Sequence, residues 1–371
     1  MSRFVSGGDM KKVMVIGAGK VGSLISVLLL ESKAYDVFLV DSHIDHPNAT
    51  KLLSLYPKIP LKSLDVTQLK PLQDYMQECQ IDAVISALPY FLNEYIAQSA
   101  RKIGVHYFDL TEDVQTTNKI KLLARQGTHA FIPQCGVAPG FINIITEYLM
   151  SLFDECHEVK LRVGGLPQYI DNAFKYGLTW SLDGLINQYS NLCPAIEDRK
   201  VVMLEPLDDL EKLMLGGCEY EAFTTSGGSG HLVETKAGLV NYLNYKTIRY
   251  PGHCEKIRFL MHDLQLKNDK PTLLKILNQC LPRVVDDLLI LYASVTGYKD
   301  GQFDEKHYFH QIYPHQFQGL YWTAMQTATA SSVCAVIDMI LNDPVSPKGL
   351  ILHERFDFNF FLENRFATCF R

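Results

Sequence analysis

The stretch VMVIGAGKVG at residues 13–22 decides the fold of the first half of the chain. Its first four residues are an apolar run rich in β-branched side chains, which predicts a strand buried on both faces. The glycine pattern GxGxxG follows at once, and apolar residues then recur at helical spacing from Val21 to Leu29. A second apolar run, 37–40, ends at Asp41. Strand, glycine turn, helix and strand together predict a right-handed βαβ unit.

The alternation of strands and helices continues to about residue 135. Further strands are predicted at 61–64, 83–86, 105–108 and 130–132, and helices at 68–78, 92–102 and 114–127. We therefore predict an α/β fold whose N-terminal domain, residues 11–136, is a Rossmann-type, doubly wound parallel sheet.

The residues of the glycine turn each have a task in dinucleotide binding. Gly17 permits the tight turn, Gly19 lets the backbone approach the pyrophosphate, and Gly22 lets the helix pack closely. The helix that begins with Lys20 and Val21 offers its N–H groups to the phosphates. The alternative is a turn that needs glycine for structural reasons only.

Other residues at strand ends complete the predicted cofactor site. Asp41 lies nineteen residues beyond Gly22. Its carboxylate would accept hydrogen bonds from both ribose hydroxyls and repel a 2′-phosphate, so NAD is predicted in preference to NADP. The alternative is that Asp41 caps a helix. Asp65 and Val66 are expected to border the adenine, and the segment Ala87-Leu88-Pro89 is expected to pass beneath the cofactor.

The second half of the chain has a different pattern after Pro139-Gly140. A helix is predicted at 141–153, and short strands at 158–163, 201–203, 220–225, 243–249 and 288–296, the last pairing with 303–312 across the turn 297–301. This predicts an α+β domain with a mixed or antiparallel sheet, residues 137–320, for substrate binding and dimerisation. Residues 321–371 are predicted to return to the Rossmann domain through a helix at 322–341 and a packed aromatic tail at 356–370.

Composition excludes several classes of protein. The 35 Lys and Arg against 41 Asp and Glu give a net charge of 35 − 41 = −6, so no nucleic-acid partner is predicted. The longest apolar runs noted, 28–30 and 288–291, are too short to span a bilayer, so no membrane association is predicted. Nine cysteines without CxxC spacing predict a cytoplasmic protein that has no disulfide framework.

Two smaller features also carry predictions. Residues 1–10 have no apolar core segment, so we expect a loose leader rather than a secretory signal. His307 and His310 would face opposite sides of a strand, and no third ligand is spaced with them, so no metal site is predicted.

Eight motifs, in order along the chain, carry a family resemblance; they are residues 15–22, 86–90, 107–111, 135–140, 178–181, 224–228, 245–253 and 323–328. Together they resemble the saccharopine dehydrogenase family, in its saccharopine-reductase-like branch. That branch includes lysine 6-dehydrogenases, which residues 225–228 and 244–253 resemble most, and carboxynorspermidine dehydrogenases. One departure is Gly177, which stands where saccharopine reductases are expected to have a lysine, and it puts saccharopine in doubt as the substrate.

The resemblance implies NAD(P)-dependent oxidation of a carbon–nitrogen bond in an amino acid, with hydride transfer to the nicotinamide. Lysine 6-deamination is the first choice, ahead of saccharopine and carboxynorspermidine. A homodimer or higher homo-oligomer is also expected. The rival hypothesis is a catalytically inactive, NAD-binding regulatory or scaffold protein, because fold alone does not fix function.

Asp109 and Cys135 are the predicted catalytic residues. Both end predicted strands at the sheet edge where ligands of open α/β sheets bind. Asp109 would transfer a proton, with a pKa raised by partial burial. Its alternative role is to cap the helix that begins near Asp113. Cys135 would contact substrate or act in catalysis, and its alternative is a small core residue.

Arg249 is the predicted anchor for the substrate carboxylate, and its alternative is an exposed strand arginine. We expect it to border one interdomain cleft together with Asp109 and Cys135. The predicted substrate-binding set also contains a loop that offers N–H groups, a tryptophan that either walls the substrate or packs in the core, and a histidine on resemblance alone: Thr225, Ser226, Gly227, Trp180 and His253.

Overall fold

The computed structural model describes residues 10–45, 47–125 and 127–371, which form two compact units. Unit 1 contains the described residues up to Cys135 together with 329–351 and 364–367, and unit 2 contains 136–328, 352–363 and 368–371. The predicted third segment, 321–371, is therefore divided between the two units. The predicted leader lies outside the described residues apart from Met10.

Unit 1 is built on a seven-stranded sheet whose neighbouring strands are all parallel. In spatial order the strands are β17 (Gly349–Leu350), β6 (Ala130–Ile132), β5 (His106–Asp109), β4 (Ala83–Ser86), β1 (Lys11–Ile16), β2 (Tyr35–Asp41) and β3 (Leu61–Ser63). This order confirms the predicted doubly wound sheet, whose switch point lies between β1 and β4. The strand β17 was not predicted, because two residues carry no readable periodicity.

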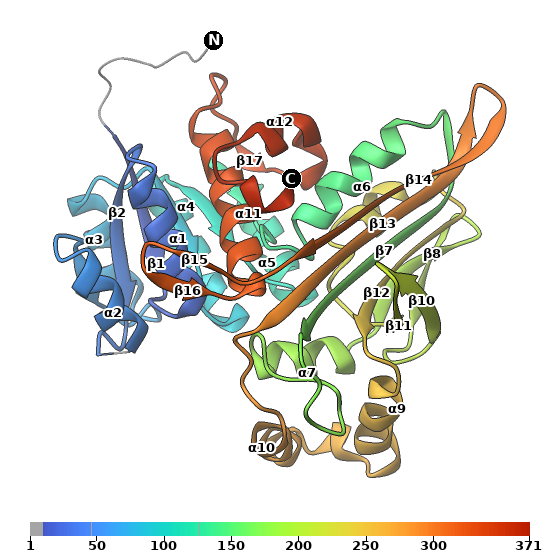
Figure 1. The fold of residues 1–371 in the computed structure, drawn as a ribbon. Helices are drawn as coiled ribbons and strands as arrows, with labels where there is room; N and C mark the ends of the chain where they lie inside the picture. Colours follow the sequence, from blue (N-terminus) through green and yellow to red (C-terminus); the bar gives the residue numbers. More distant parts are fainter. Residues whose placement is uncertain (1–9, 46, 126) are drawn as a thin grey trace. The chain divides into compact units, whose positions relative to one another are not determined.

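Helices connect the strands of unit 1 (Figure 1). They are α1 (Lys20–Glu31), α2 (Pro47–Leu55), α3 (Leu69–Glu78), α4 (Asn93–Ile103) and α5 (Val114–Ala124), with a short 3₁₀ turn, η1, at Tyr90–Leu92. The helix α2 was not predicted. The other helices match their predicted ranges to within about three residues at each end. The apolar faces of α3, α4 and α5 join the strands in one buried core.

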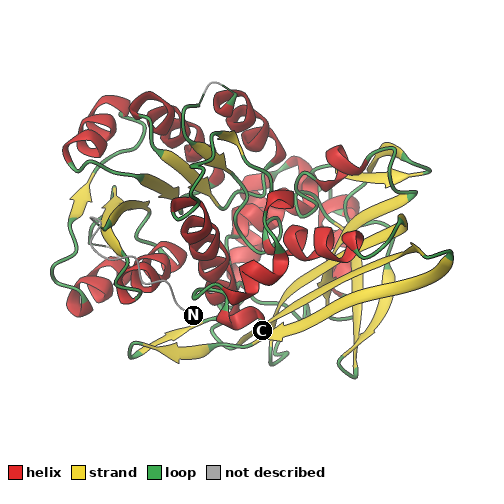
Figure 2. Cartoon of the chain, turned by 90° about the horizontal axis from the view of Figure 1, so that it is seen from above, coloured by secondary structure: helices red, strands yellow, loops and turns green. Residues whose placement is uncertain are grey.

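Unit 2 is built on an eight-stranded mixed sheet, visible as the long strands of Figure 2. The main path runs through β10 (Glu211–Leu215), β11 (Cys218–Thr224), β12 (Tyr242–Arg249), β7 (Glu155–Pro167), β13 (Asp287–Lys299) and β14 (Gln302–Ile312). Off this path, β8 (Cys193–Glu197) pairs with β12, and β9 (Lys200–Leu204) pairs with β8. The pair β12–β7 is parallel and the other pairs are antiparallel. The prediction of a mixed sheet is thus confirmed, whereas β8 and β10 were missed.

The register of β12 and β7 assigns side chains to the two faces of this sheet. Lys246 pairs with Arg162, so these two side chains share one face. Thr247 pairs with Val163 on the opposite face. Because side chains alternate along a strand, Arg249 lies on the face of Thr247 and not on that of Arg162.

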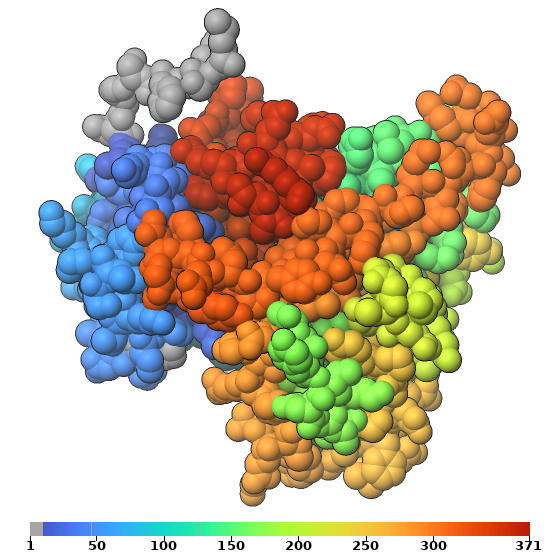
Figure 3. All heavy atoms as spheres, viewed as in Figure 1, coloured from blue at the N-terminus to red at the C-terminus, as the bar shows by residue number. Residues whose placement is uncertain are grey.

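The strands β13 and β14 form the predicted hairpin, but with a shorter turn than 297–301. Both strands continue to the two-residue turn Asp300-Gly301, whose φ values of 50° and 76° fit a type I′ turn. The tip of this hairpin is exposed (orange in Figure 3).

The remaining elements of unit 2 surround its sheet. The helices are α6 (Phe141–Ser151), α7 (Leu182–Ser190), α8 (Leu232–Lys236), α9 (His253–Arg258), α10 (Lys270–Cys280) and α12 (Phe358–Glu363), with a π-helical segment, η2 (Phe259–Asp263), and 3₁₀ turns η3 (Leu266–Asn268), η4 (His353–Arg355) and η5 (Thr368–Phe370). A small hairpin is formed by β15 (His315–Phe317) and β16 (Leu320–Trp322). The aromatic tail is packed as predicted, since Phe370 stacks on Phe141 with ring centroids 4.0 Å apart.

The helix α11 (Ala324–Leu341) begins in unit 2 and continues in unit 1. Within the described part of the chain it is the one helix long and apolar enough to cross a membrane. Because 78% of its apolar window is buried inside the structure, it has the pattern of a core helix.

Candidate active site

The glycine turn between β1 and α1 has the geometry that a dinucleotide requires. Gly17 has a φ of 108°, which residues with a side chain rarely adopt. A Cβ at Gly22 would lie 1.8 Å from the carbonyl oxygen of Gly17, so a larger residue would push α1 away from the turn. A Cβ at Gly19 would meet no atom within 4 Å, so the space beside this residue is open.

Asp41 ties the end of β2 to the glycine turn. One carboxylate oxygen accepts a hydrogen bond of 2.6 Å from the N–H of Ala18, and the other accepts one of 2.8 Å from the N–H of His43. These donors are not in a helix, and α2 begins only at Pro47, so the alternative of a helix cap is wrong. The carboxylate lies where the ribose of a dinucleotide is expected.

The loop after β4 lies against the same turn. The Ala87 carbonyl oxygen would be 2.8 Å and the Leu88 Cδ2 3.1 Å from a Cβ at Gly17, so the structure brings these two predicted residues to the turn, with exposed Pro89 next along the chain. In the loop after β3, Val66 is buried in the core. Asp65 is exposed, and hydrogen bonds from Thr67 lower its pKa.

The residues present therefore fit a dinucleotide. The N-cap residue of α1, Gly19, has no side chain that could occupy the helix N-terminus, and the first turn of α1 contains no acidic residue. Lys20 is exposed there, and Val21 is half-buried.

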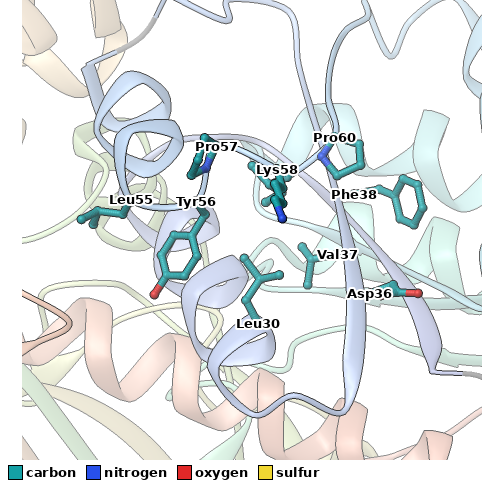
Figure 4. A pocket seen from close by; sticks show the side chains of 10 residues that line it. Leu30, Asp36, Val37, Phe38, Leu55, Tyr56, Pro57, Lys58 and Pro60 are labelled. Carbon is teal, nitrogen blue, oxygen red and sulfur yellow. The ribbon is translucent and has the colours of Figure 1, made fainter.

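A cavity of about 500 Å³ in unit 1 is not this site. Figure 4 shows its lining by Leu30, Val37, Phe38 and the loop Leu55–Pro60. Asp36 and Val37, which also line the cavity, belong to the first half of β2, whereas Asp41 ends that strand. The cavity therefore lies toward the N-terminal end of β2, whereas the glycine turn lies at the C-terminal end of that strand.

Asp109 is fully buried at the end of β5, and both of its oxygens accept hydrogen bonds. One accepts from the N–H groups of Thr111 and Gln134, each at 2.9 Å, and the other accepts from the Tyr107 hydroxyl at 2.8 Å. Burial raises the pKa of Asp109 to about 6, although these donors oppose the shift. The cap of α5 is instead Asp113, which accepts from Thr116 at 2.7 Å, so the alternative role for Asp109 is wrong.

Cys135 has the environment of a core residue. Its side chain is fully buried, and its thiol donates to the Ile132 carbonyl at 3.1 Å. Burial, followed by the nearby Asp109, raises the pKa of Cys135 well above that of a free thiol, so the reactive thiolate is disfavoured. A catalytic role for Cys135 stays a prediction.

Glu112 is a carboxyl group that the sequence reasoning missed. It lies between β5 and α5, three residues after Asp109, and its side chain is half-buried. Burial raises its pKa to about 7, and the nearby Asp113 and Asp109 add to the shift. Its position directly after the motif 107–111 was the only signal that could have drawn attention to it.

Arg249 ends β12 and is 2% exposed, so the alternative of an exposed strand arginine is wrong. Its Nε donates to the Tyr189 hydroxyl at 3.0 Å, and its Nη1 donates to the Ile248 carbonyl at 2.8 Å. The guanidinium also lies over the ring of Tyr176, 4.6 Å from the centroid. Among the described residues, no carboxylate lies within ion-pair distance of Arg249.

His253 is fully buried at the start of α9, and the Tyr189 hydroxyl links it to Arg249. Its Nδ1 lies 2.8 Å from the Phe174 carbonyl oxygen, and its Nε2 lies 3.1 Å from the Tyr189 hydroxyl. Burial, followed by the charge of Arg249, lowers the pKa of His253 to about 3, so the ring is neutral. Direct contact between His253 and substrate stays a prediction.

The other predicted substrate residues divide into two groups. The Thr225 hydroxyl lies 2.6 Å from that of Thr247, on the face of β12 that carries Arg249. Gly227 follows in the same loop with a φ of 91°. Ser226 instead uses its N–H to bind the Gln188 carbonyl of α7, and Trp180 packs against an apolar core cluster, which favours its alternative role.

Four residues of this region were not predicted. Tyr245 and Thr247 lie on the same face of β12 as Arg249, and the ring of Tyr245 packs directly on Gly228. Strand alternation, counted back from Arg249, could have found both. Tyr176 and Tyr189 come from segments far away in the sequence, and no local pattern indicates them. Within the described ranges, no group of three or more His, Cys, Asp or Glu residues is placed to hold a metal ion.

Comparison with known families covers almost the whole chain. The saccharopine dehydrogenase NADP binding domain matches residues 13–130, and the saccharopine dehydrogenase C-terminal domain matches residues 136–364. The chain belongs to the saccharopine dehydrogenase family. The resemblance seen in the sequence motifs is thereby confirmed, and membership in this family supports a dehydrogenase that uses a nicotinamide cofactor.

Solved structures and curated proteins add two kinds of likeness. The apo saccharopine dehydrogenase (L-Glu forming) from Saccharomyces cerevisiae has a TM-score of 0.78 and 15% identity, over 95% of this chain and 96% of that one, and so shares the fold. Malate dehydrogenase from Geobacillus kaustophilus (strain HTA426) is 28% identical over 164 residues, 44% of this chain and 48% of that protein. Its counterpart from Bacillus thuringiensis (strain Al Hakam) is 29% identical over the same length. The chain spans about half the length of these curated relatives.

Proposed function

We propose that this member of the saccharopine dehydrogenase family is an NAD-dependent dehydrogenase that oxidises a CH–NH bond of an amino acid. Lysine 6-deamination is the first candidate reaction. The observation that carries the proposal is Arg249, a buried guanidinium for which the described residues provide no carboxylate. A ligand with a carboxylate would supply that missing charge.

Each unit contains a buried ionisable group that has no oppositely charged partner among the described residues, and an amino acid would supply both partners. In unit 1, the buried carboxyl of Asp109 has no cationic partner among the described residues, and its bonds come from neutral donors. In unit 2, Arg249 has no anionic partner. An amino acid with an ammonium and a carboxylate group carries the two charges that are missing. Asp109 and Arg249 lie in different units, and their meeting in one cleft stays a prediction.

NAD is proposed as the cofactor because of Asp41. Its carboxylate lies at the end of β2 and is fixed by the N–H of Ala18, so it would accept hydrogen bonds from ribose hydroxyls and repel a 2′-phosphate. The matching family domain is described as NADP binding, which favours the other choice. Kinetics with both cofactors decide between them.

The residues of the chain then have distinct tasks. A bound nicotinamide cofactor would accept the hydride at its C4 atom. Arg249 would hold the substrate carboxylate and so fix the position of the carbon–nitrogen bond. Asp109 would take a proton from the substrate ammonium before the bond is oxidised. The oxidised carbon–nitrogen bond then adds water and breaks to give an aldehyde and ammonia.

Gly177 makes saccharopine a weaker candidate for the substrate than lysine. A Cβ at this residue would lie 2.2 Å from Val284 and 3.0 Å from the Pro282 carbonyl oxygen, so a lysine does not fit here in this structure. The chain thus lacks the lysine expected in saccharopine reductases, and carboxynorspermidine remains the other alternative.

The location and assembly of the enzyme are also proposals. We propose a cytoplasmic enzyme, because all nine cysteines are free in the structure. We propose a homodimer or higher homo-oligomer, which light scattering on the purified chain tests.

The test of function is absorbance at 340 nm with NAD or NADP and a panel of L-lysine, saccharopine and carboxynorspermidine. We expect reduction of NAD with at least one of these amines. No turnover with any of them, despite cofactor binding measured by calorimetry, would support the catalytically inactive regulatory or scaffold protein.

A further inference from the structure

Tyr107 is a buried tyrosine whose hydroxyl lies between two hydrogen-bond acceptors. It belongs to β5, its side chain is fully buried, and its ring stacks on that of Phe131. The hydroxyl oxygen lies 2.8 Å from Oδ2 of Asp109 and 3.5 Å from the carbonyl oxygen of Asn93. A hydroxyl has one proton and so donates to one acceptor at a time. The longer contact is at the limit of hydrogen bonding, so the hydroxyl donates to the carboxylate in this structure.

The two oxygens of Asp109 have different surroundings. Oδ1 accepts from the backbone N–H groups of Thr111 and Gln134, and these groups can only donate. Among the described residues, the one hydrogen-bonding group at Oδ2 is the Tyr107 hydroxyl. A proton added to Asp109 therefore goes to Oδ2, where the oxygen of Tyr107 is its acceptor. That bond forms only when the hydroxyl turns its own proton away from Asp109.

Asn93 offers the hydroxyl a second acceptor that is fixed in place. It begins α4 and is buried, and its side-chain Oδ1 accepts a hydrogen bond of 2.7 Å from the hydroxyl of Ser86. Ser86 ends β4 and pairs with Asp109 in the register of β4 and β5. The bond between Ser86 and Asn93 thus ties the start of α4 to the strand beside Asp109. This tie keeps the Asn93 carbonyl next to Tyr107.

The titratable groups around Asp109 leave the hydroxyl to respond to this carboxyl alone. The groups that interact with Asp109 are Tyr107, Cys135 and Glu112, and none of them is a cation; Asp113, beyond Glu112, caps α5. Burial, followed by the charge of Asp109, raises the pKa of both Tyr107 and Cys135 well above the usual values, so both keep their protons. Burial raises the pKa of Asp109 itself to about 6. Near neutral pH, Tyr107 therefore changes its direction and not its charge.

A second buried tyrosine–aspartate pair in unit 1 lacks this freedom. The Tyr35 hydroxyl donates to Oδ1 of Asp338 at 2.5 Å and accepts from the side-chain amide of Asn342 at 3.3 Å. Asp338 also binds Arg365 at 2.6 Å, so its charge is neutralised within the chain. Tyr35 thus has one acceptor and one donor, and its proton has a single direction. Tyr107, in contrast, has two acceptors and no donor among the described residues.

We propose that the Tyr107 hydroxyl has two positions: it donates to ionised Asp109, and it turns to the Asn93 carbonyl when Oδ2 carries a proton. In the reaction, an N–H bond of the substrate ammonium breaks, an O–H bond forms at Oδ2, and the Tyr107 oxygen accepts from the new O–H. Tyr107 and Asn93 are positioning residues, because neither gains or loses a proton. The proposal rests on the proposed function, which it deepens by explaining how a buried carboxyl without a cation holds a proton.

The pKa of Asp109 is first measured without turnover. Denaturant titration from about pH 4 to about pH 8 compares each protein with its own Asp109→Asn variant. In the wild type, the difference between the two stabilities should level off above the pKa of Asp109, about 6. In Tyr107→Phe this pKa should rise by about one unit, because the ionised carboxylate loses a stronger hydrogen bond than the neutral carboxyl does. An unchanged or lowered pKa would overturn the proposal.

Tyr35→Phe is the matched control, because it also removes a buried hydroxyl that binds an aspartate but leaves Asp109 untouched. It should change neither the pKa of Asp109 nor the limb of the pH–rate profile near that pKa of about 6. In Tyr107→Phe the same limb should move upward by about one pH unit, while KM for the amino acid at high pH stays nearly constant. Equal shifts in the two variants would reduce the role of Tyr107 to general packing.

Asp109→Asn tests the second position of the hydroxyl directly. When the Asn oxygen accepts from Thr111 and Gln134, its NH₂ group takes the place of Oδ2 and donates to the Tyr107 oxygen. The hydroxyl must then turn to Asn93, and crystal structures should show the distance between these two oxygens shorten from 3.5 Å to about 2.8 Å. A distance that does not shorten relative to the wild type would contradict the proposal.

The results also separate this proposal from the proposed function. A raised pKa of Asp109 in Tyr107→Phe, without any NAD-dependent turnover by the wild type, supports the two positions of the hydroxyl and contradicts the dehydrogenase. Turnover by the wild type, with the same pKa of Asp109 in Tyr107→Phe, supports the dehydrogenase and contradicts the two positions.

Discussion

Two buried arginines on opposite faces of the second sheet differ in what neutralises them. Arg162 on β7 is 1% exposed and forms an ion pair with Glu211, which also binds Lys246 at 3.0 Å. Its Nη1 donates to the carbonyls of Leu161 and Asn244. Arg249 on β12 is equally buried but binds a hydroxyl, a carbonyl and aromatic rings.

This difference distinguishes a structural charge from a charge kept for a ligand. The charge of Arg162 is neutralised within the chain by the carboxylate of Glu211. Where Arg249 ends its strand, the available carboxylate of Glu221 is turned to a helix N-terminus instead. A buried ion is costly without a partner, so its persistence is an argument for function.

The largest effect is expected from breaking the completed pair. Arg162→Met should lower the free energy of unfolding by about 3–5 kcal/mol, because the half-buried Glu211 loses its main partner and keeps only Lys246, while the carbonyls of Leu161 and Asn244 lose a buried donor. Denaturant titration measures the loss, and KM for the amino acid should not change in the protein that remains folded. A stable Arg162→Met enzyme with a raised KM would show that both arginines serve the ligand.

The opposite pattern is expected for Arg249→Met. KM for the amino acid should rise roughly 1000-fold, because two charge-assisted hydrogen bonds to the carboxylate are lost, while kcat changes much less. The free energy of unfolding should stay the same or increase, since an unpaired buried charge is removed. Steady-state kinetics and denaturant titration of the same preparation test both halves. Severe destabilisation would place Arg249 with Arg162 as a structural residue.

Asp109 extends the comparison to the first unit, because it too is buried without an opposite charge. Asp109→Asn should lower kcat about 100-fold and remove the limb of the pH–rate profile near its pKa of about 6. The fold should survive, because the Asn oxygen still accepts from Thr111 and Gln134. If the pH–rate profile of the variant kept this limb, another group would have to transfer the proton, and Glu112 would be the first residue to test.

Stability gives an independent check on the same carboxyl. Its pKa is raised from 3.8 in the unfolded chain to about 6 in the folded protein. Between about pH 4 and pH 6 the folded state therefore holds more protons, and the contribution of Asp109 to stability falls as the pH rises through this window. Asn has no such proton, so the stability of Asp109→Asn relative to wild type should improve from pH 4 to pH 6.

The features that could be predicted from the sequence are local ones. The glycine turn, Asp41 and the strand that ends at Arg249 each combine a short motif with a periodic neighbour, and the structure places each as expected. The order of the motifs along the chain also indicated the family. These signals need only a few consecutive residues.

The features that were missed depend on contacts between distant segments. Tyr189 reaches Arg249 across 60 positions, and the N–H of Gln134 reaches Asp109 across 25. The strand β17 joins the first sheet only after the chain has passed through the second unit. No pattern within one segment specifies such partners, so the sequence could indicate Arg249 but not whether its charge is neutralised.

The smallest expected effect concerns Asp41, which combines both kinds of role. Its carboxylate accepts hydrogen bonds from the N–H groups of Ala18 and His43, and it also lies where a ribose is expected to bind. Asp41→Ala should therefore weaken NAD binding only about tenfold, the value of one or two hydrogen bonds, and should improve NADP binding because a repelling charge is lost. Asp41→Asn is the matched variant: it keeps an acceptor for Ala18 but not the charge, so it should recover NAD affinity while still tolerating NADP. Calorimetry with both cofactors measures this, and a wild-type protein that prefers NADP would show that the carboxylate of Asp41 serves only to fix the glycine turn.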